Sequence, residues 1–378
     1  MKKIFVLVKP ASAFCNMRCK YCFYANVSSL REVRSFGNMT KETTEKMIEN
    51  IYKDMDDGDE LTIGFQGGEP TMAGLQYFEY LMECIDRQSK KLNLNFSIQT
   101  NGTLINEQWC EFFKKYNFLV GLSIDQAKKF HDANRLDSQG NGTFDRVMKT
   151  KKLFDKYEIE YNVLTVLTEK LSNHAKEVFD FILENGIKYV QFIPCLDDLD
   201  KNPDDEKNEY ALTPKGFYKF YSELLPLWLD ELKNNNYISI KYFDDIFNLI
   251  AKKQVTACGM IGKCQVQFII EGDGSVYPCD FFALDEYKMG NIKDMSLNEL
   301  FYQKAAQIFL NSRKPYDLPN KCKSCRYYNI CKGGCKRMKD AQYVDETENF
   351  CGHEQTLNIL IPEIKNIIQI ISQQYTNR

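Results

Sequence analysis

The sequence predicts an α/β protein in which a parallel sheet, closed or half-closed into a barrel, is followed by a smaller cysteine-rich region. Strand-like apolar runs alternate with helix-length amphipathic stretches through the first half of the chain, which is typical of a sheet built from βα units. Cysteine and glycine then become dense between residues 258 and 351. We therefore expect a partial (β/α)6 barrel of the TIM type and a second, cysteine-rich domain.

Each element of the barrel is expected from a short run of the sequence. The strands are expected at residues 4–8, 61–66, 95–99, 118–123, 161–167 and 189–193, and the helices between them at about 41–55, 75–89, 107–116, 144–157 and 173–185. In such barrels the functional residues gather at the carboxyl ends of the strands.

The repetition stops near residue 195. An acidic stretch at 197–209 predicts a surface loop, and a helix is expected at about 214–234. A β-hairpin is expected around Gly272-Asp273-Gly274, and a final apolar helix at about 357–372. The change in composition lies at about residues 235–250 and predicts two domains, residues 1–235 and 236–378.

Composition narrows the class of protein. The 378 residues are 44% apolar and 27% charged, with a net charge of −3, so nucleic acid or an anionic membrane is not expected as a partner. No apolar run approaches the roughly 20 residues that span a bilayer. The apolar run that follows Lys2-Lys3 is short and closes at Lys9-Pro10, which predicts a first strand rather than a signal peptide. We expect a cytoplasmic protein.

The cysteines predict metal binding. Fourteen cysteines in a cytoplasmic chain are unsuited to disulfides, and three histidines are too few for mixed Cys/His zinc fingers. All-cysteine ligation remains, either of iron–sulfur clusters or of zinc. Cys84, Cys110 and Cys195 fall outside the cysteine groups, and the first two are expected to be core residues.

Cys15, Cys19 and Cys22 form a C-x3-C-x2-C motif directly after the first expected strand. Three thiolates leave one iron of a [4Fe–4S] cube open to a small molecule, whereas zinc normally takes a fourth protein ligand. This motif resembles that of the radical S-adenosylmethionine (AdoMet) superfamily, in which AdoMet binds the open iron and is cleaved to a 5′-deoxyadenosyl radical.

Further stretches extend this resemblance. Gly67-Gly68-Glu69-Pro70 is similar to the GGEP motif of the superfamily, where glycine admits a close backbone approach and Glu69 can bind the ammonium of AdoMet. The polar ends of the third and fourth strands, with Asp125 in the second of them, are expected beside the nucleoside. The resemblance implies AdoMet contacts from Tyr21, Gly68, Ser123, Arg135 and Leu196. Gln126-Ala127 stands where related sequences usually have Gly-Pro.

Eight further cysteines form an array from Cys258 to Cys351, enough for two fully ligated clusters or two zinc sites. The array resembles the SPASM extension of radical AdoMet enzymes that modify peptides. That resemblance assigns Cys258, Cys264, Cys279 and Cys335 to a first auxiliary cluster, and Cys322, Cys325, Cys331 and Cys351 to a second. It implies three [4Fe–4S] clusters and AdoMet as cofactors.

Within that group the chain resembles the anaerobic sulfatase-maturating enzymes, for example in Cys22-Phe23-Tyr24 and Cys279-Asp280-Phe281. Those enzymes convert a Cys or Ser of a sulfatase motif into Cα-formylglycine (3-oxoalanine). The resemblance implies that Asp280 is the proton acceptor, that an unfolded or nascent sulfatase is the substrate, and that ferredoxin or flavodoxin supplies electrons. A maturase that crosslinks a ribosomally made peptide, and a non-catalytic multi-zinc scaffold, are the alternatives.

Overall fold

The computed structural model describes residues 1–201, 205–260, 262–312 and 318–376. Within these ranges the chain forms two compact units, each made of several segments. The first unit contains Met1–Ile124, Asp132–Tyr161 and Gln265–Ser312. The second contains Asp125–His131 and the described residues of Asn162–Cys264 and Arg313–Arg378.

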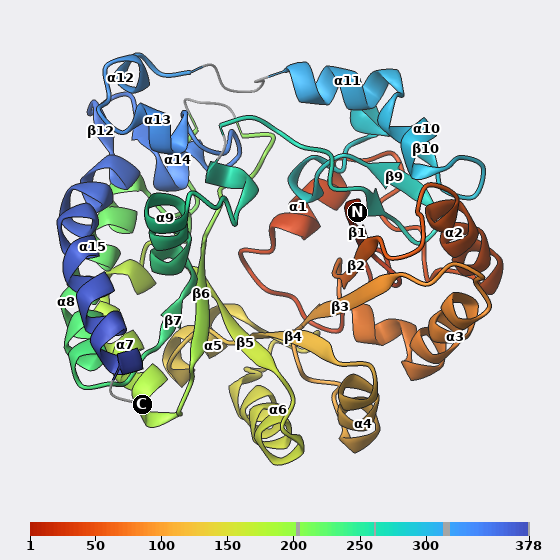
Figure 1. Cartoon of the computed structure of the whole chain (residues 1–378), viewed down its shortest axis with the longest axis horizontal. Helices are drawn as coiled ribbons and strands as arrows, with labels where there is room; N and C mark the ends of the chain where they lie inside the picture. The colour runs from red at the N-terminus through yellow and green to blue at the C-terminus, as the bar shows by residue number, and fades with distance from the viewer. Residues whose placement is uncertain (202–204, 261, 313–317, 377–378) are drawn as a thin grey trace. The chain divides into compact units, whose positions relative to one another are not determined.

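The strands of the first unit form one sheet in the order β10-β9-β8-β1-β2-β3-β4. Neighbours from β1 to β4 are parallel, and β1 also pairs in parallel with β8 of the predicted hairpin. The bounds are β1 Lys3–Val8, β2 Glu60–Phe65, β3 Asn93–Thr100, β4 Phe118–Ser123, β8 Ile269–Ile270, β9 Ser275–Tyr277 and β10 Gly290–Asn291. Residues that follow β1, β2 and β8 therefore emerge at the same edge of this sheet (Figure 1).

Helices connect these strands and bury one apolar face each. Their bounds are α1 Phe23–Ser29, α2 Lys41–Lys53, η1 Pro70–Ala73, α3 Leu75–Asp86, α4 Glu107–Lys115, α6 Phe144–Tyr157, η4 Asp280–Phe282, η5 Asp285–Tyr287, α10 Leu297–Phe301 and α11 Lys304–Asn311. Thr40 caps α2 and Asn106 caps α4. Each side chain accepts a hydrogen bond from the backbone N–H three residues further along the chain, which fixes where the helix begins. The core between sheet and helices is aromatic, with Phe65 packed edge-on against Phe78.

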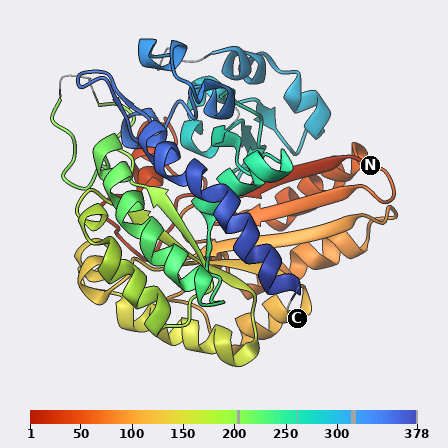
Figure 2. The ribbon, with the colours of Figure 1, turned by 60° about the vertical axis from the view of Figure 1, so that its left-hand side comes forward.

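The second unit carries the parallel strands β5 Tyr161–Leu167, β6 Tyr189–Pro194 and β7 Ser239–Ile240, together with the short antiparallel pair β11 Val344–Asp345 and β12 Phe350–Cys351. Its helices are η2 Leu171–Asn173, α7 Ala175–Glu184, α8 Pro214–Lys233, α9 Lys241–Lys252, η3 Cys258–Met260, α12 Asn320–Lys323, α13 Tyr328–Cys331, α14 Lys339–Gln342 and α15 Gly352–Thr376. α5 Lys128–Asn134 has residues in both units. The long helices α8 and α15 run side by side (Figures 1 and 2).

The predicted α/β class is confirmed, and so is the hairpin with its glycine turn at Gly274. The predicted ends of β4, β5 and α6 match the structure, and the other predicted barrel elements differ by a few residues at their ends. α9 was not predicted, although it lies where the change in composition placed a domain boundary. None of the described helices is long and apolar enough to cross a membrane.

Candidate active site

The loop with Cys15, Cys19 and Cys22 leaves the end of β1, and its backbone is fixed on both sides. Arg18 N–H donates to Leu136 O at 2.7 Å, and Lys20 N–H donates to Asn134 O at 3.0 Å. α1 begins directly after Cys22, which occupies the N-cap position. The three thiols are half-buried. Secondary structure on either side of the loop thus holds them at the strand end where the sequence predicts them.

Gly68 lies where two loops make their closest approach. Its N–H donates to Ser12 O at 2.8 Å, and the next N–H, of Glu69, donates to Phe14 O at 2.7 Å. A Cβ atom on Gly68 would lie 2.1 Å from Phe14 O, a distance that no side chain tolerates. The glycine is therefore required for the loop after β2 to pack against the residue that precedes Cys15.

The Glu69 carboxylate is buried between the ends of β2 and β3. Oε1 accepts bonds from Thr71 and Thr100, and Oε2 accepts from Asn101 N–H at 2.7 Å. Burial raises the pKa of Glu69, while these hydrogen bonds act in the opposite direction. Oε2, with one donor, keeps the capacity for the ammonium group that the sequence analysis assigns to Glu69.

The other predicted AdoMet contacts are divided between the units. In the first unit the Arg135 guanidinium lies over the Tyr21 ring at 5.6 Å, and Ser123 ends β4. In the second unit Asp125 accepts a bond from Val166 N–H at 3.1 Å, and the buried Leu196 follows β6. The structure thus brings Tyr21 and Arg135 together.

Asp280 begins the short helix η4 and is held from two directions. Its Oδ1 lies 2.6 Å from Lys9 Nζ, and its Oδ2 accepts a bond from Gln66 Nε2 at 3.0 Å. The next residue, Phe281, packs edge-on against Phe23, the first residue of α1, with ring centroids 5.0 Å apart. The predicted proton acceptor is therefore tied to the helix that follows the three-cysteine loop.

Lys9 also belongs to a second buried ion pair. Its ammonium is fully buried, lies 3.5 Å from a Glu271 oxygen and 3.5 Å from the centroid of the Tyr24 ring. Glu271 further accepts bonds from Tyr24 Oη at 2.5 Å, Arg31 at 2.7 Å and Ser12 at 2.9 Å. Burial alone would raise the pKa of Glu271, but Lys9 and Arg31 hold it below its ordinary value.

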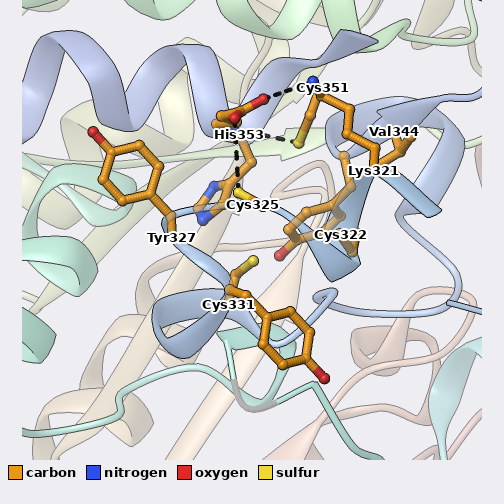
Figure 3. A pocket seen from close by; sticks show the side chains of 11 residues that line it. Lys321, Cys322, Cys325, Tyr327, Cys331, Val344, Cys351 and His353 are labelled. Carbon is orange, nitrogen blue, oxygen red and sulfur yellow. Dashed lines mark hydrogen bonds and ion pairs between the residues drawn. The ribbon is translucent and has the colours of Figure 1, made fainter. Parts of the chain in front are cut away.

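Four cysteines of the second unit line one cavity, which Figure 3 shows from close by. They are Cys322, Cys325, Cys331 and Cys351, the four that the resemblance assigns to one cluster. Glu354 contributes two contacts: its N–H donates to Cys351 Sγ at 3.4 Å, and its carboxylate accepts from Cys325 Sγ at 3.8 Å. The donor set, four thiols converging on one space, fits a fully ligated [4Fe–4S] cluster.

The remaining four array cysteines are placed in different units. Cys258, Cys264 and Cys335 lie in the second unit, where a Cβ on Gly259 would lie 3.6 Å from Cys335 Cβ. Cys279 lies in the first unit, directly before Asp280 and after the hairpin. Burial raises the pKa of the Cys258 thiol, and the nearby Cys335 and Cys264 add to this shift.

The three cysteines outside the groups are buried: Cys84 and Cys110 in helices α3 and α4, and Cys195 after β6. None of the fourteen cysteines, all within the described ranges, forms a disulfide.

Sequence reasoning missed the residues that surround Asp280. Lys9, Gln66 and Glu271 are the first residues after β1, β2 and β8, and the parallel register places them together. A polar or charged side chain directly after an apolar strand was the available signal. The pairing of Lys9 with Glu271 depends on the contact of β1 with the hairpin, which no local pattern predicts.

Two regions of the chain match known protein families. Residues 10–182 match the radical SAM superfamily, and residues 258–326 match the SPASM iron–sulfur cluster-binding domain. The chain is 39% identical to a cysteine-type anaerobic sulfatase-maturating enzyme of Clostridium novyi, with 93% of each chain covered. It is 29% identical to a serine-type enzyme of Bacteroides thetaiotaomicron, with 91% of this chain and 85% of that one covered.

A solved structure gives the same result. Native anSMEcpe with bound AdoMet and the Cp18Cys peptide matches with a TM-score of 0.86 and 37% identity, over 97% of this chain and 99% of that chain. Likeness at this level over nearly the whole length removes the zinc-scaffold alternative. The chain belongs to the radical SAM superfamily and, within it, to the anaerobic sulfatase-maturating enzymes.

Proposed function

We propose that this enzyme oxidises a cysteine in a sulfatase active-site motif to Cα-formylglycine, and accepts serine less readily. Membership of the family brings three [4Fe–4S] clusters and AdoMet as cofactors. The preference for cysteine is supported by the relatives, of which the cysteine-type enzyme is 39% identical and the serine-type enzyme 29%. The observation that carries the proposal is the buried Asp280 carboxylate beside the helix that follows the three-cysteine loop.

The assignment of residues to cofactors follows the positions described above. We assign Cys15, Cys19 and Cys22 to the cluster that binds AdoMet, and the eight array cysteines to the two auxiliary clusters. Tyr21, Gly68, Glu69, Ser123, Asp125, Arg135 and Leu196 are the proposed AdoMet contacts. The close approach at Gly68 and the stacking of Arg135 on Tyr21 support this assignment.

The cofactors and the protein have separate parts in the reaction. When bound, AdoMet and its cluster supply a 5′-deoxyadenosyl radical that takes one hydrogen atom from Cβ, and an auxiliary cluster supplies an acceptor for one electron. Asp280 takes the proton of the substrate thiol through a carboxylate oxygen. Loss of a hydrogen atom, a proton and an electron leaves a C=S double bond, and water then replaces sulfur with oxygen to release H₂S and formylglycine.

An unfolded or nascent sulfatase is the proposed partner. A low-potential carrier such as ferredoxin or flavodoxin is the proposed electron donor. We propose a cytoplasmic location, because that compartment keeps cluster-ligating thiols reduced.

Activity on matched peptides tests the proposal. The anaerobically reconstituted enzyme is incubated with AdoMet, a reductant and two peptides that differ only by Cys or Ser in a Cys/Ser-x-Pro/Ala-x-Arg motif. We expect formylglycine from both by mass spectrometry, with faster formation from the Cys peptide. AdoMet cleavage without any oxidation of either peptide would reject the sulfatase assignment and favour a crosslinking maturase.

A further inference from the structure

We propose that Lys9 is a positioning residue for Asp280. Its buried ammonium, 2.6 Å from Oδ1, holds the carboxylate in the orientation in which it meets the substrate thiol. This inference rests on the proposed function and adds to it the group that prepares the proton acceptor.

The two oxygens of Asp280 have different surroundings. Oδ2 accepts a hydrogen bond from Gln66 Nε2 at 3.0 Å. Oδ1 lies 2.6 Å from Lys9 Nζ. At this distance the ammonium makes a charge-assisted contact that fixes Oδ1, so both oxygens of the carboxylate are held.

Lys9 is held rigidly enough to do this. The ammonium lies over the Tyr24 ring and within 3.5 Å of Glu271, and the side chain is fully buried. The Lys9 N–H donates to Ile270 O at 2.8 Å, which continues the ladder between β1 and β8. Lys9 is therefore fixed by the sheet at its backbone and by a carboxylate and a ring at its tip.

Lys9 also keeps its charge. Burial alone would lower the pKa of Lys9, but the carboxylates of Asp280 and Glu271 and the Tyr24 hydroxyl outweigh burial and hold the pKa above its ordinary value. Glu271 has a second cation in Arg31, at 2.7 Å, so it remains paired if Lys9 is removed. Asp280, in contrast, has no other cation within ion-pair distance among the described residues.

The Asp280 carboxylate is also held by residues that are not cluster ligands. Asp280 follows Cys279, yet Lys9 and Gln66 hold its carboxylate from the ends of β1 and β2. The acceptor is thus positioned by the sheet as well as by the neighbouring cluster ligand.

The test compares Lys9→Met with Arg31→Met in the reconstituted holoenzyme. Both variants remove one buried cation next to Glu271, but only Lys9 contacts Asp280. The substrate is a Cys peptide with deuterium at Cβ, and the readouts are iron content, peptide affinity, deuterium in 5′-deoxyadenosine, and formylglycine formed per 5′-deoxyadenosine.

For Lys9→Met we expect iron content, peptide affinity and deuterium transfer close to those of the parent enzyme. Formylglycine per 5′-deoxyadenosine should fall by about 10-fold or more, because a misplaced general base forfeits part of the 10²–10⁴-fold it contributes. Arg31→Met should leave this ratio unchanged. An unchanged ratio in Lys9→Met, or an equal fall in both variants, would overturn the inference.

If Lys9→Met does not fold, the Lys9→Arg variant tests the inference instead. A guanidinium keeps the charge but is longer, planar and forked, so it cannot hold Asp280 Oδ1 where the Lys9 ammonium holds it. A lowered ratio with normal iron content and peptide affinity supports positioning by Lys9, and a parental ratio refutes it. If the parent enzyme oxidises no Cys peptide, the proposed function itself fails and this inference fails with it.

Discussion

At the scale of single residues, the close approach of Gly68 to the three-cysteine loop constrains the proposed AdoMet site. Gly68 lies outside the positive-φ region that favours glycine, so steric contact alone excludes a side chain there. Gly58 offers the opposite case, because it has a φ of 81° and no atom lies within 4 Å of the place that a Cβ would take. Gly68 is therefore required because a side chain has no room there, whereas Gly58 is favoured because its backbone has a positive φ.

Gly68→Ala is expected to displace the loop that carries Cys15, because the new methyl group would lie 2.1 Å from Phe14 O. The reconstituted variant should lose about four of twelve irons and cleave no AdoMet. Gly58→Ala should keep its irons and lose only about 1–2 kcal/mol of stability. Iron and sulfide analysis measures this, and full iron content with normal AdoMet cleavage in Gly68→Ala would contradict the account.

Cysteines of similar burial should respond differently to substitution. Cys331 lines the cavity of the second unit, whereas Cys110 is buried in α4. Cys331→Ala should lower the iron content by about four per chain, and Cys110→Ala should leave about twelve. Equal iron content in the two variants would remove Cys331 from the ligand set.

At the scale of elements, the hairpin β8–β9 is attached to the first unit by a short ladder and a buried charge network. Only Ile269 and Ile270 pair with β1, and Glu271 follows them into contact with Lys9 and Arg31. The network therefore carries much of the attachment that so short a ladder cannot provide.

Glu271→Gln should destabilise the protein by about 3 kcal/mol at pH 7, because it leaves the buried Arg31 guanidinium without its carboxylate partner. The pKa of Glu271 is lowered by folding, so its contribution is present above the ordinary value of 4.5 and is lost as pH falls through the folded pKa. The difference in Tm between parent and variant should hence shrink below about pH 4.5.

The control for this prediction is Glu60→Gln, which removes a partly exposed ion pair with Lys3 between β1 and β2. Such a pair is worth at most about 1 kcal/mol. A Tm loss in Glu271→Gln no larger than that in Glu60→Gln would show that the network does not hold the hairpin.

α15 supports the cysteine cavity of the second unit, since it begins directly after Cys351 and packs beside α8. Leu357→Ala removes a fully buried side chain of this helix and should cost about 2–5 kcal/mol. Ile368→Ala, on an exposed position of the same helix, should change stability by less than about 0.5 kcal/mol. Chemical denaturation compares them, and equal losses would deny α15 this supporting role.

At the scale of the whole molecule, the sequence predicts the elements better than the contacts between them. Runs such as the one forming β4 are apolar and bounded by turns, and caps at Thr40 and Asn106 mark helix starts, so both are local signals. α9 was missed because its amphipathic pattern lies inside a stretch interpreted as a domain boundary.

The candidate site was predictable to the same degree. The cysteine groups and Asp280 are recognisable from spacing and resemblance. The Lys9–Glu271 pair, in contrast, joins residues 262 positions apart in the sequence. Such a pair is set by the parallel register of β1 and β8. Local patterns contain no information on that register.

We propose that a hydrogen atom leaves Cβ of a peptide cysteine and that Asp280 takes the thiol proton in the same turnover. The most direct test of this proposal follows deuterium from a Cβ-deuterated Cys peptide in the parent enzyme and in Asp280→Asn. We expect about one deuterium in 5′-deoxyadenosine for each formylglycine in the parent. In Asp280→Asn we expect continued deuterium transfer with almost no formylglycine. No deuterium in 5′-deoxyadenosine, or parental formylglycine formation in Asp280→Asn, would contradict the proposal.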